Sequence, residues 1–279
     1  MDQNILKLST AANNELLLRI GSALVVGPLA IAAAYAGEFY FVAFWLLAAI
    51  LIWREWIRLV LPAISLPVLG TGILALSIAA ILVETIQVSL LVVALAAVAL
   101  LVLVPRGRKR WLQGGLIYVA ALLLAPVILR QDPDFGFAAI AFLFGIVWST
   151  DSVAYFVGRA VGGPKLWSRV SPKKTWSGAV GGVIGAVLCA LLLAKAFELP
   201  NLTAIALLSV ILSIGSQAGD LFESGLKRHF GVKDSGHLIP GHGGLMDRLD
   251  GFLIAASIAA LIGFARGGVQ HASQGLLIW

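Results

Sequence analysis

Acidic residues in the last third of the chain stand at spacings suited to holding a cation. Asp220 and Glu223 are three positions apart, and so are Asp247 and Asp250. Residues three apart share one face of a helix, so each pair can present its oxygens together. Such oxygens suit Mg²⁺, which takes one or two carboxylates together with substrate phosphates and water. We therefore predict a metal site formed by Asp220, Asp247 and Asp250, with Asp151 as a further ligand or a group behind the ligands.

The same carboxylates have a simpler alternative role. They could pair with Lys227, Arg228 or Arg248 and only stabilise helix ends, because a charge within an apolar region is costly unless it is used or paired. The sequence leaves both interpretations open.

The segment from Ser224 to Asp250 surrounds these acids with groups that suit a phosphate ligand. Carboxylates alternating with cations can bind a metal and neutralise the remaining oxygens of a polyphosphate. Glycines around His242 permit close approach of the backbone to a ligand. His242 could carry a proton, donate to a phosphate or be an ordinary loop residue. The predicted catalytic residues are Asp220, Asp247, Asp250, Lys227 and Arg228, and the predicted substrate-binding residues here are Lys233, His242, Gly243, Gly244 and Arg248.

A second polar segment, from Gly158 to Gly178, is basic. Its cations and hydroxyls, followed by the start of an apolar run, make a candidate anion site, because the free N–H groups of a helix N-terminus favour phosphate. Basic loops beside membranes also contact lipid headgroups or only determine topology. The substrate-binding candidates in this segment are Lys173, Lys174 and Thr175.

Long apolar segments must position these groups. Of the 279 residues, 60% are hydrophobic and 12% charged, against about 45–50% and about 25% in soluble domains. This composition excludes a soluble single-domain enzyme and a disordered chain. A membrane helix needs about 20 mostly apolar residues, so we predict an all-α, polytopic integral membrane protein with about nine transmembrane helices, in a range of eight to ten. The predicted spans are Ile20–Ala36, Phe39–Trp53, Leu66–Val83, Val88–Val104, Gly114–Leu129, Phe135–Gly158, Gly178–Phe197, Leu202–Phe222 and Gly251–Ala265.

The basic residues predict how these spans are oriented. Lys and Arg accumulate in short cytoplasmic loops. With a cytoplasmic N-terminus, 17 of the 20 Lys and Arg residues lie on the cytoplasmic side, and Arg130, Lys195 and Arg266 lie on the other. We therefore expect a multi-pass protein of the cell (inner) membrane whose site faces the cytoplasm. The net charge of +6 then reflects topology, and no nucleic-acid partner is expected.

We expect one multi-pass membrane domain over residues 1–279, with N-terminal spans in 1–150 and catalytic spans and loops in 151–265. No cleavage-site pattern follows the first apolar run, so that run is expected to be retained. Gly178, Gly181, Gly182 and Gly185 let helix backbones approach closely in lipid, and such faces are also compatible with a homodimer. A single cysteine, Cys189, supports neither an intrachain disulfide nor a cysteine metal cluster.

The segment Ser224–Asp250 resembles the sequence signature of the phosphatidate cytidylyltransferase family, also called CDP-diacylglycerol synthases. The match covers 27 consecutive positions without a gap. Asp151-Ser-Val-Ala-Tyr155 with Gly158-Arg159, and Ser171-Pro-Lys-Lys174-Thr-Trp176, are similar to further family motifs. Many members have an acidic residue after that tryptophan, where this chain has Ser177.

The resemblance implies a membrane enzyme that joins CTP to phosphatidic acid and releases pyrophosphate and CDP-diacylglycerol. It also implies a multi-helical fold and dependence on Mg²⁺, with a monovalent cation such as K⁺ used by some members. The expected partners are therefore CTP, phosphatidic acid and the lipid bilayer.

Two other functions remain as alternatives. A CTP-dependent membrane lipid kinase, similar to the polyprenol (dolichol) kinases, would move the γ-phosphoryl group to a lipid alcohol. A transporter of anionic lipids or nucleotides is less consistent with the sequence, because transport sites usually lie near the bilayer midplane whereas these charges gather at one face.

Overall fold

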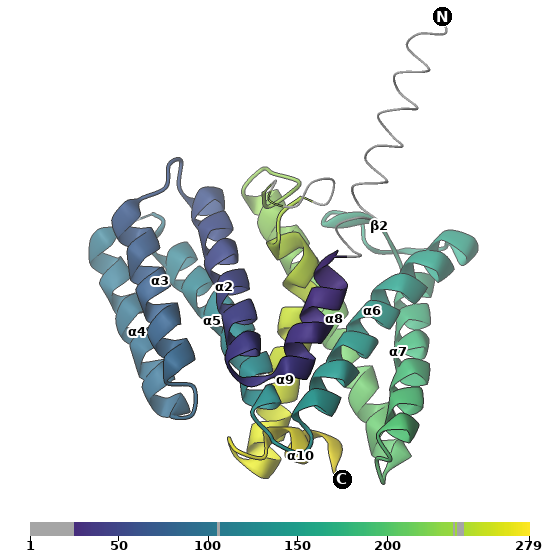
Figure 1. Ribbon diagram of the computed structural model, residues 1–279. Helices are drawn as coiled ribbons and strands as arrows, with labels where there is room; N and C mark the ends of the chain where they lie inside the picture. The colour runs from purple at the N-terminus through teal and green to yellow at the C-terminus, as the bar shows by residue number, and fades with distance from the viewer. Residues whose placement is uncertain (1–24, 105–106, 237, 239–242) are drawn as a thin grey trace, which may run out of the picture.

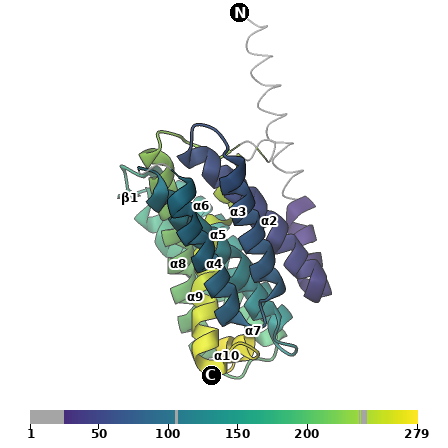
Figure 2. The same ribbon diagram turned by 90° about the vertical axis from the view of Figure 1, so that its left-hand side faces the viewer.

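The computed structural model describes residues 25–104, 107–236, 238 and 243–279. Within these ranges the chain is a bundle of long helices with one short β-hairpin (Figures 1 and 2), so the predicted all-α fold is confirmed. After a helix at Val25–Ala36, the elements are α2 (Glu38–Val60), α3 (Leu66–Ile81), α4 (Ile86–Leu103), α5 (Lys109–Arg130), α6 (Gly136–Val161), β1 (Lys165–Trp167), β2 (Ser171–Thr175), α7 (Trp176–Ala196), α8 (Leu202–His229), α9 (Met246–Gly267) and α10 (Ala272–Leu277).

Seven helices in the described part of the chain are long and apolar enough to cross a membrane. Two shorter apolar helices, Val25–Ala36 and α3, match the remaining predicted spans. Helices are suited to a membrane because the backbone N–H and C=O groups of a helix bond to one another, and lipid offers them no hydrogen-bond partners. Large apolar side chains such as Leu188 and Leu192 on α7 are 59% and 70% exposed, as expected for contact with lipid. The chain is therefore a multi-pass membrane protein.

The helices form two groups joined through α9. Helices α2 to α5 pack together at the left of Figure 1, and α6 to α8 lie at the right. Helix α9 packs against α5 in the first group and α8 in the second. The hairpin and the segment before α9 lie at one end of the bundle, and α10 lies at the opposite end (Figure 1).

Two helices differ from the predicted spans where the polar residues lie. Helix α8 continues to His229, beyond the expected end at Phe222, and α9 begins at Met246 rather than at Gly251. Polar residues can extend a helix beyond its apolar run, so hydropathy alone underestimates its length. As a result, Lys227 belongs to the last turns of α8 and Asp247 to the first turn of α9.

The basic segment before α7 forms the hairpin, which the sequence analysis did not predict. Strands β1 and β2 are antiparallel, with Lys165 opposite Thr175 and Trp167 opposite Ser171. Gly162, with φ +66°, ends α6, and only glycine adopts such a conformation without strain. At the other end, the hydroxyl of Thr175 accepts a hydrogen bond from the N–H of Gly178 and caps α7.

The glycines of α7 pack this helix closely against α6. All four of Gly178, Gly181, Gly182 and Gly185 are buried, and a Cβ on any of them would lie 2.9 Å or less from an atom of α6. For Gly182 that atom is the backbone carbonyl oxygen of Thr150, at 2.9 Å. The predicted packing role is confirmed, and because it operates within one chain these glycines give no support to a homodimer.

A valine at Gly182 should therefore separate α6 from α7. Overpacking of this kind costs about 1–3 kcal/mol, so Gly182→Val should lower the midpoint of thermal unfolding in detergent by several degrees. Gly70→Val is the matched control, because a Cβ on Gly70 in α3 meets no atom within 4 Å. Equal melting temperatures for the two variants would contradict the packing role.

Candidate active site

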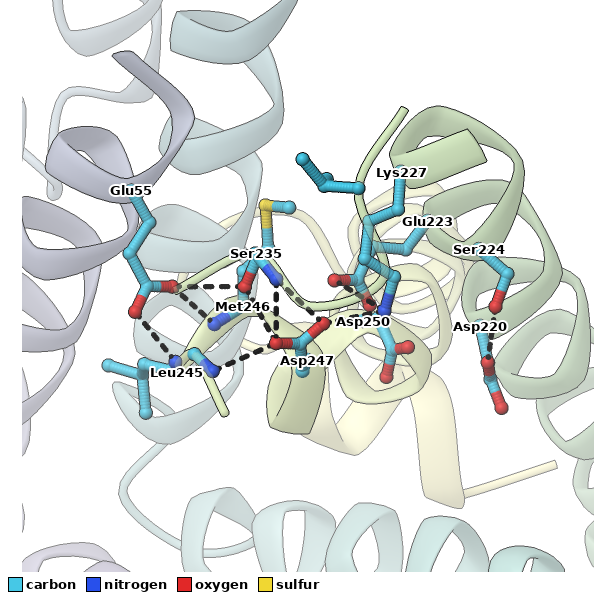
Figure 3. Close-up of polar contacts among 12 residues, drawn as sticks. Glu55, Asp220, Glu223, Ser224, Lys227, Ser235, Leu245, Met246, Asp247 and Asp250 are labelled. Atoms are coloured by element: carbon cyan, nitrogen blue, oxygen red, sulfur yellow. Dashed lines mark hydrogen bonds and ion pairs between the residues drawn. The ribbon is translucent and has the colours of Figure 1, made fainter. Parts of the chain in front are cut away.

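An ion pair between adjacent helices forms the centre of the polar cluster. Lys227 of α8 places its Nζ 2.5 Å from Oδ1 of Asp247 in α9. The same Nζ lies 3.4 Å from Oε1 of Glu223, one turn earlier in α8. The side chains of Lys227, Asp247 and Glu223 are 12%, 7% and 0% exposed. This group of charges is therefore shielded from water and links α8 to α9 (Figure 3).

Ser235, Gly243 and Gly244, which precede α9, surround the other carboxylate oxygen of Asp247. Oδ2 accepts hydrogen bonds from the N–H of Ser235 at 2.9 Å, from the Ser235 hydroxyl at 2.9 Å and from the N–H of Gly244 at 2.8 Å. Gly243 has φ +84°, and a Cβ there would lie 3.0 Å from Oδ2. Ser235, Gly243 and Gly244 are therefore arranged around Asp247. The ion pair of Asp247 with Lys227 is one of the pairings that the sequence left open.

Glu223 and Asp250 form a second acidic pair across α8 and α9. Glu223 is fully buried, and within the described residues its charged partner is Lys227, whose Nζ lies 3.4 Å from Oε1. The Glu223 carboxyl group is also close enough to Asp250 for a hydrogen bond between the two acids as well as for charge repulsion, and Figure 3 shows both beside Lys227. Asp250 Oδ1 accepts the N–H of Gly251 at 2.7 Å. Three acidic side chains, those of Glu223, Asp247 and Asp250, thus gather around Lys227.

Asp220 has different neighbours from Glu223, although the two are one turn apart. Lys174 of β2 forms an ion pair with Asp220, and the hydroxyl of Ser224 lies 3.4 Å from Asp220 Oδ1. Their spacing would have allowed Asp220 and Glu223 to present their oxygens together. In the structure, Asp220 joins α8 to the hairpin through Lys174, and Glu223 lies beside Asp250 of α9 (Figure 3).

Asp151 of α6 belongs to the same electrostatic environment. It interacts with the charges of Asp220 and Asp250, and with those of Lys174 and Arg248. Side chains from α6, β2, α8 and α9 thus converge at one end of the bundle. No three acidic, histidine or cysteine side chains of the described residues are arranged to hold a metal ion, so the predicted ligand set of Asp220, Asp247, Asp250 and Asp151 stays a prediction.

The remaining predicted site residues lie around this cluster. Lys173 and Lys233 are exposed, and Arg228 is exposed and donates to the carbonyl of Val232 at 3.1 Å. The hydroxyl of Thr175 is occupied in capping α7. His242 lies outside the described residues.

Ser177, where the resemblance suggested an acidic residue, bonds within the chain. Its hydroxyl donates to the carbonyl of Gly162 and so ties the start of α7 to the end of α6. Ser177 also lines an open apolar groove of about 470 Å³ between α6 and α7, together with Val153, Val157, Trp176, Val180, Gly181 and Ile184.

Glu55 of α2 is a buried acidic residue beside this cluster that the sequence did not single out. Glu55 is 5% exposed, and its two oxygens accept the N–H groups of Leu245 and Met246, each at 2.9 Å. A signal existed, because Glu55 lies only two positions after the apolar run that ends at Trp53. Arg54 and Arg58 on either side of it were interpreted only as topology signals, and the acid between them was overlooked.

Comparison with known proteins identifies the family of this chain. A family model described as the cytidylyltransferase family matches residues 17–265. A phosphatidate cytidylyltransferase of Brucella suis is 50% identical over 175 residues, which cover 62% of this chain and 65% of the relative. The enzyme of that name from Bacillus subtilis is 42% identical over 138 residues, covering 49% and 51%. The chain thus spans just under two thirds of the length of the Brucella relative and about half of the Bacillus one. Because the family model covers nearly the whole bundle, the chain belongs to the cytidylyltransferase family.

Proposed function

We propose that this protein is a phosphatidate cytidylyltransferase, which converts CTP and phosphatidic acid into CDP-diacylglycerol and pyrophosphate in phospholipid biosynthesis. The observation that carries the proposal is the shielded cluster of Lys227, Asp247, Glu223 and Asp250 at one end of a membrane bundle. Family membership and the names of the relatives support the same activity.

The reaction proposed is a direct in-line displacement. A phosphate oxygen of phosphatidate attacks the α-phosphorus of CTP, the new P–O bond forms, and the bond to the β-phosphate bridging oxygen breaks to release pyrophosphate. The attacking oxygen is already ionised at neutral pH, so a strong general base is unnecessary. The protein must therefore mainly position two anions and neutralise their charge.

The cations of the site are suited to that neutralisation. Lys227 sits inside the cluster, and Lys174 lies at its edge beside Asp220. Exposed cations nearby can receive the outer phosphate oxygens as the substrates approach. We assign triphosphate and lipid phosphate binding to Lys173, Lys174, Lys227, Arg228, Lys233 and Arg248, with His242, Gly243 and Gly244 lining the nucleotide pocket.

The acidic residues are suited to a divalent metal. Asp250 fits best, because it interacts with the charges of both Asp220 and Asp151, and Mg²⁺ prefers one or two carboxylates together with substrate phosphates. We propose that Asp220, Asp247 and Asp250 hold Mg²⁺, with Asp151 behind them and a monovalent cation such as K⁺ assisting. A bound Mg²⁺ would supply charge neutralisation on the phosphate oxygens.

The lipid substrate would reach this site sideways from the bilayer. The open groove between α6 and α7 has apolar walls and ends at the first turn of α7, directly after Lys174 and Thr175. An acyl chain in the groove would leave the lipid phosphate near the hairpin cations. CTP would arrive from the cytoplasm, which requires the hairpin end of the bundle to face that side in the bacterial inner membrane.

The fate of the nucleotide phosphates tests the activity. Purified protein with phosphatidate and Mg²⁺ should place label from α-labelled CTP in the lipid and label from γ-labelled CTP in pyrophosphate, as thin-layer chromatography would show. Transfer of the γ label to a lipid alcohol would instead support the lipid kinase.

The role of Asp247 can be tested with an isosteric change. Asp247→Asn should lower kcat/KM for CTP at least about 100-fold, because a neutral amide cannot pair with Lys227 and its NH₂ group would face an N–H donor. Asp134→Asn is the matched control, since Asp134 is exposed in the loop between α5 and α6. Similar activity of Asp247→Asn and Asp134→Asn would show that Asp247 has no role in the reaction.

Orientation can be tested by labelling single cysteines in a Cys189→Ala background. A cysteine at Arg110, which is exposed in the first turn of α5, should react with a membrane-impermeant maleimide only after cells are opened. A cysteine at Asp134 should react in intact spheroplasts. The reverse pattern would overturn the assigned orientation.

A further inference from the structure

We propose that Glu55 is a positioning residue of the site: its carboxylate holds the start of α9 so that Asp247 faces Lys227. Residues 55 and 247 lie in opposite halves of the chain, on α2 and α9. The inference extends the proposed function, because its kinetic consequence concerns that reaction, although the contact itself can be tested separately.

Glu55 binds the beginning of α9 with both oxygens. Oε1 accepts the N–H of Leu245 and Oε2 accepts the N–H of Met246, each at 2.9 Å. The first N–H groups of a helix have no partner within the helix, and a negative charge there is favoured by the helix dipole. Leu245 and Met246 directly precede Asp247 in the chain. The contact with Glu55 therefore fixes the position of the Asp247 backbone, from which its side chain extends toward Lys227.

Ser235 connects Glu55 with Asp247. Its hydroxyl oxygen lies 2.9 Å from Asp247 Oδ2 and 3.4 Å from Glu55 Oε2, between the two carboxylates (Figure 3). Glycines allow the backbone to come this close. A Cβ on Gly236 would lie 2.9 Å from Glu55 Oε1, and one on Gly244 would lie 2.1 Å from the Ser235 hydroxyl and 2.8 Å from Glu55 Oε2. Gly236 and Gly244 therefore pack directly against the Glu55 carboxylate, where a larger residue would not fit.

Helix α2 is itself held firmly, which makes Glu55 a fixed point. Trp53 and Trp56 on either side of Glu55 pack against Gly72 of α3 and Gly115 of α5, where a Cβ would come within 2.0 and 2.1 Å of the indole nitrogens. The Trp56 indole also donates to the carbonyl of Trp111 at 2.8 Å. These contacts prevent α2 from turning Glu55 away from α9.

A cap that served only stability would look similar in the structure, so the experiment must separate the two roles. The variants are Glu55→Gln, which keeps the shape but turns an NH₂ group toward an N–H donor, and Glu55→Asp, which keeps the charge but shortens the reach. Glu38→Gln is the matched control, since Glu38 is exposed at the other end of the same helix. Ser235→Ala is a milder change, which removes only the hydroxyl group that lies between Glu55 and Asp247.

Two measurements on the full-length protein in lipid nanodiscs decide the matter. The first is kcat and KM for CTP, per folded enzyme, with phosphatidate as acceptor. Both Glu55 variants should lose about 10- to 100-fold in kcat, with a much smaller change in KM, and Glu38→Gln should match the wild type. The second is hydrogen exchange, in which the amides of residues 244–247 should exchange faster in the Glu55 variants while those of α6 do not change.

Unchanged kcat in the Glu55 variants, with only the melting temperature lowered, would overturn the positioning role. If those variants do not fold, Gly236→Ala decides in the same assays, because its Cβ would displace the Glu55 carboxylate: a reduced kcat with faster exchange supports the role, and wild-type values contradict it. If the wild type forms no CDP-diacylglycerol, the proposed function fails instead. Exchange at residues 244–247 then decides alone, and an unchanged rate would overturn the Glu55 contact.

Discussion

The ion pair between Lys227 and Asp247 is the interaction on which the site depends. Burying a charge at the end of an apolar bundle costs free energy unless an opposite charge or a ligand compensates it. The ion pair gives both Lys227 and Asp247 an opposite charge, and it joins α8 to α9. Asp247 in turn accepts hydrogen bonds from the N–H groups of Ser235 and Gly244, so it holds two of the described residues that precede α9. Glu223 and Asp250 lie beside the pair, so three acidic side chains gather around Lys227.

The rest of the bundle holds this pair in position. Close packing of the α7 glycines on α6 brings the hairpin and Lys174 toward Asp220. Helix α9 contacts both groups of helices, and Glu55 fixes its start from α2. Positioning and charge neutralisation are the main requirements of nucleotidyl transfer between two anionic substrates, and a rigid, one-sided cluster on a membrane protein meets both.

The sequence predicted the helical membrane fold, because long apolar runs identify membrane-spanning helices directly. It also singled out the polar residues that the structure brings together, such as Lys227 and Asp247, because charges are rare enough in this chain for their clustering to be visible. The partners of Asp220 and Glu223 could not be predicted, because i, i+3 spacing describes a single helix while Lys174 and Asp250 come from other elements. Glu55 was missed for the same reason: its partners are backbone groups about 190 positions away, and no local pattern encodes such a contact. The hairpin was missed because the basic segment has no clear alternation.

The most direct test of the Lys227–Asp247 pair as a single functional unit is a double-mutant cycle on kcat/KM for CTP, using Lys227→Met, Asp247→Asn and the combined variant in lipid nanodiscs. If the two side chains act together, the double variant should be no less active than Asp247→Asn alone, because the second change removes a partner already lost. Losses that multiply, so that the double variant falls by the product of the two single effects, would show that the residues act independently and would contradict the account.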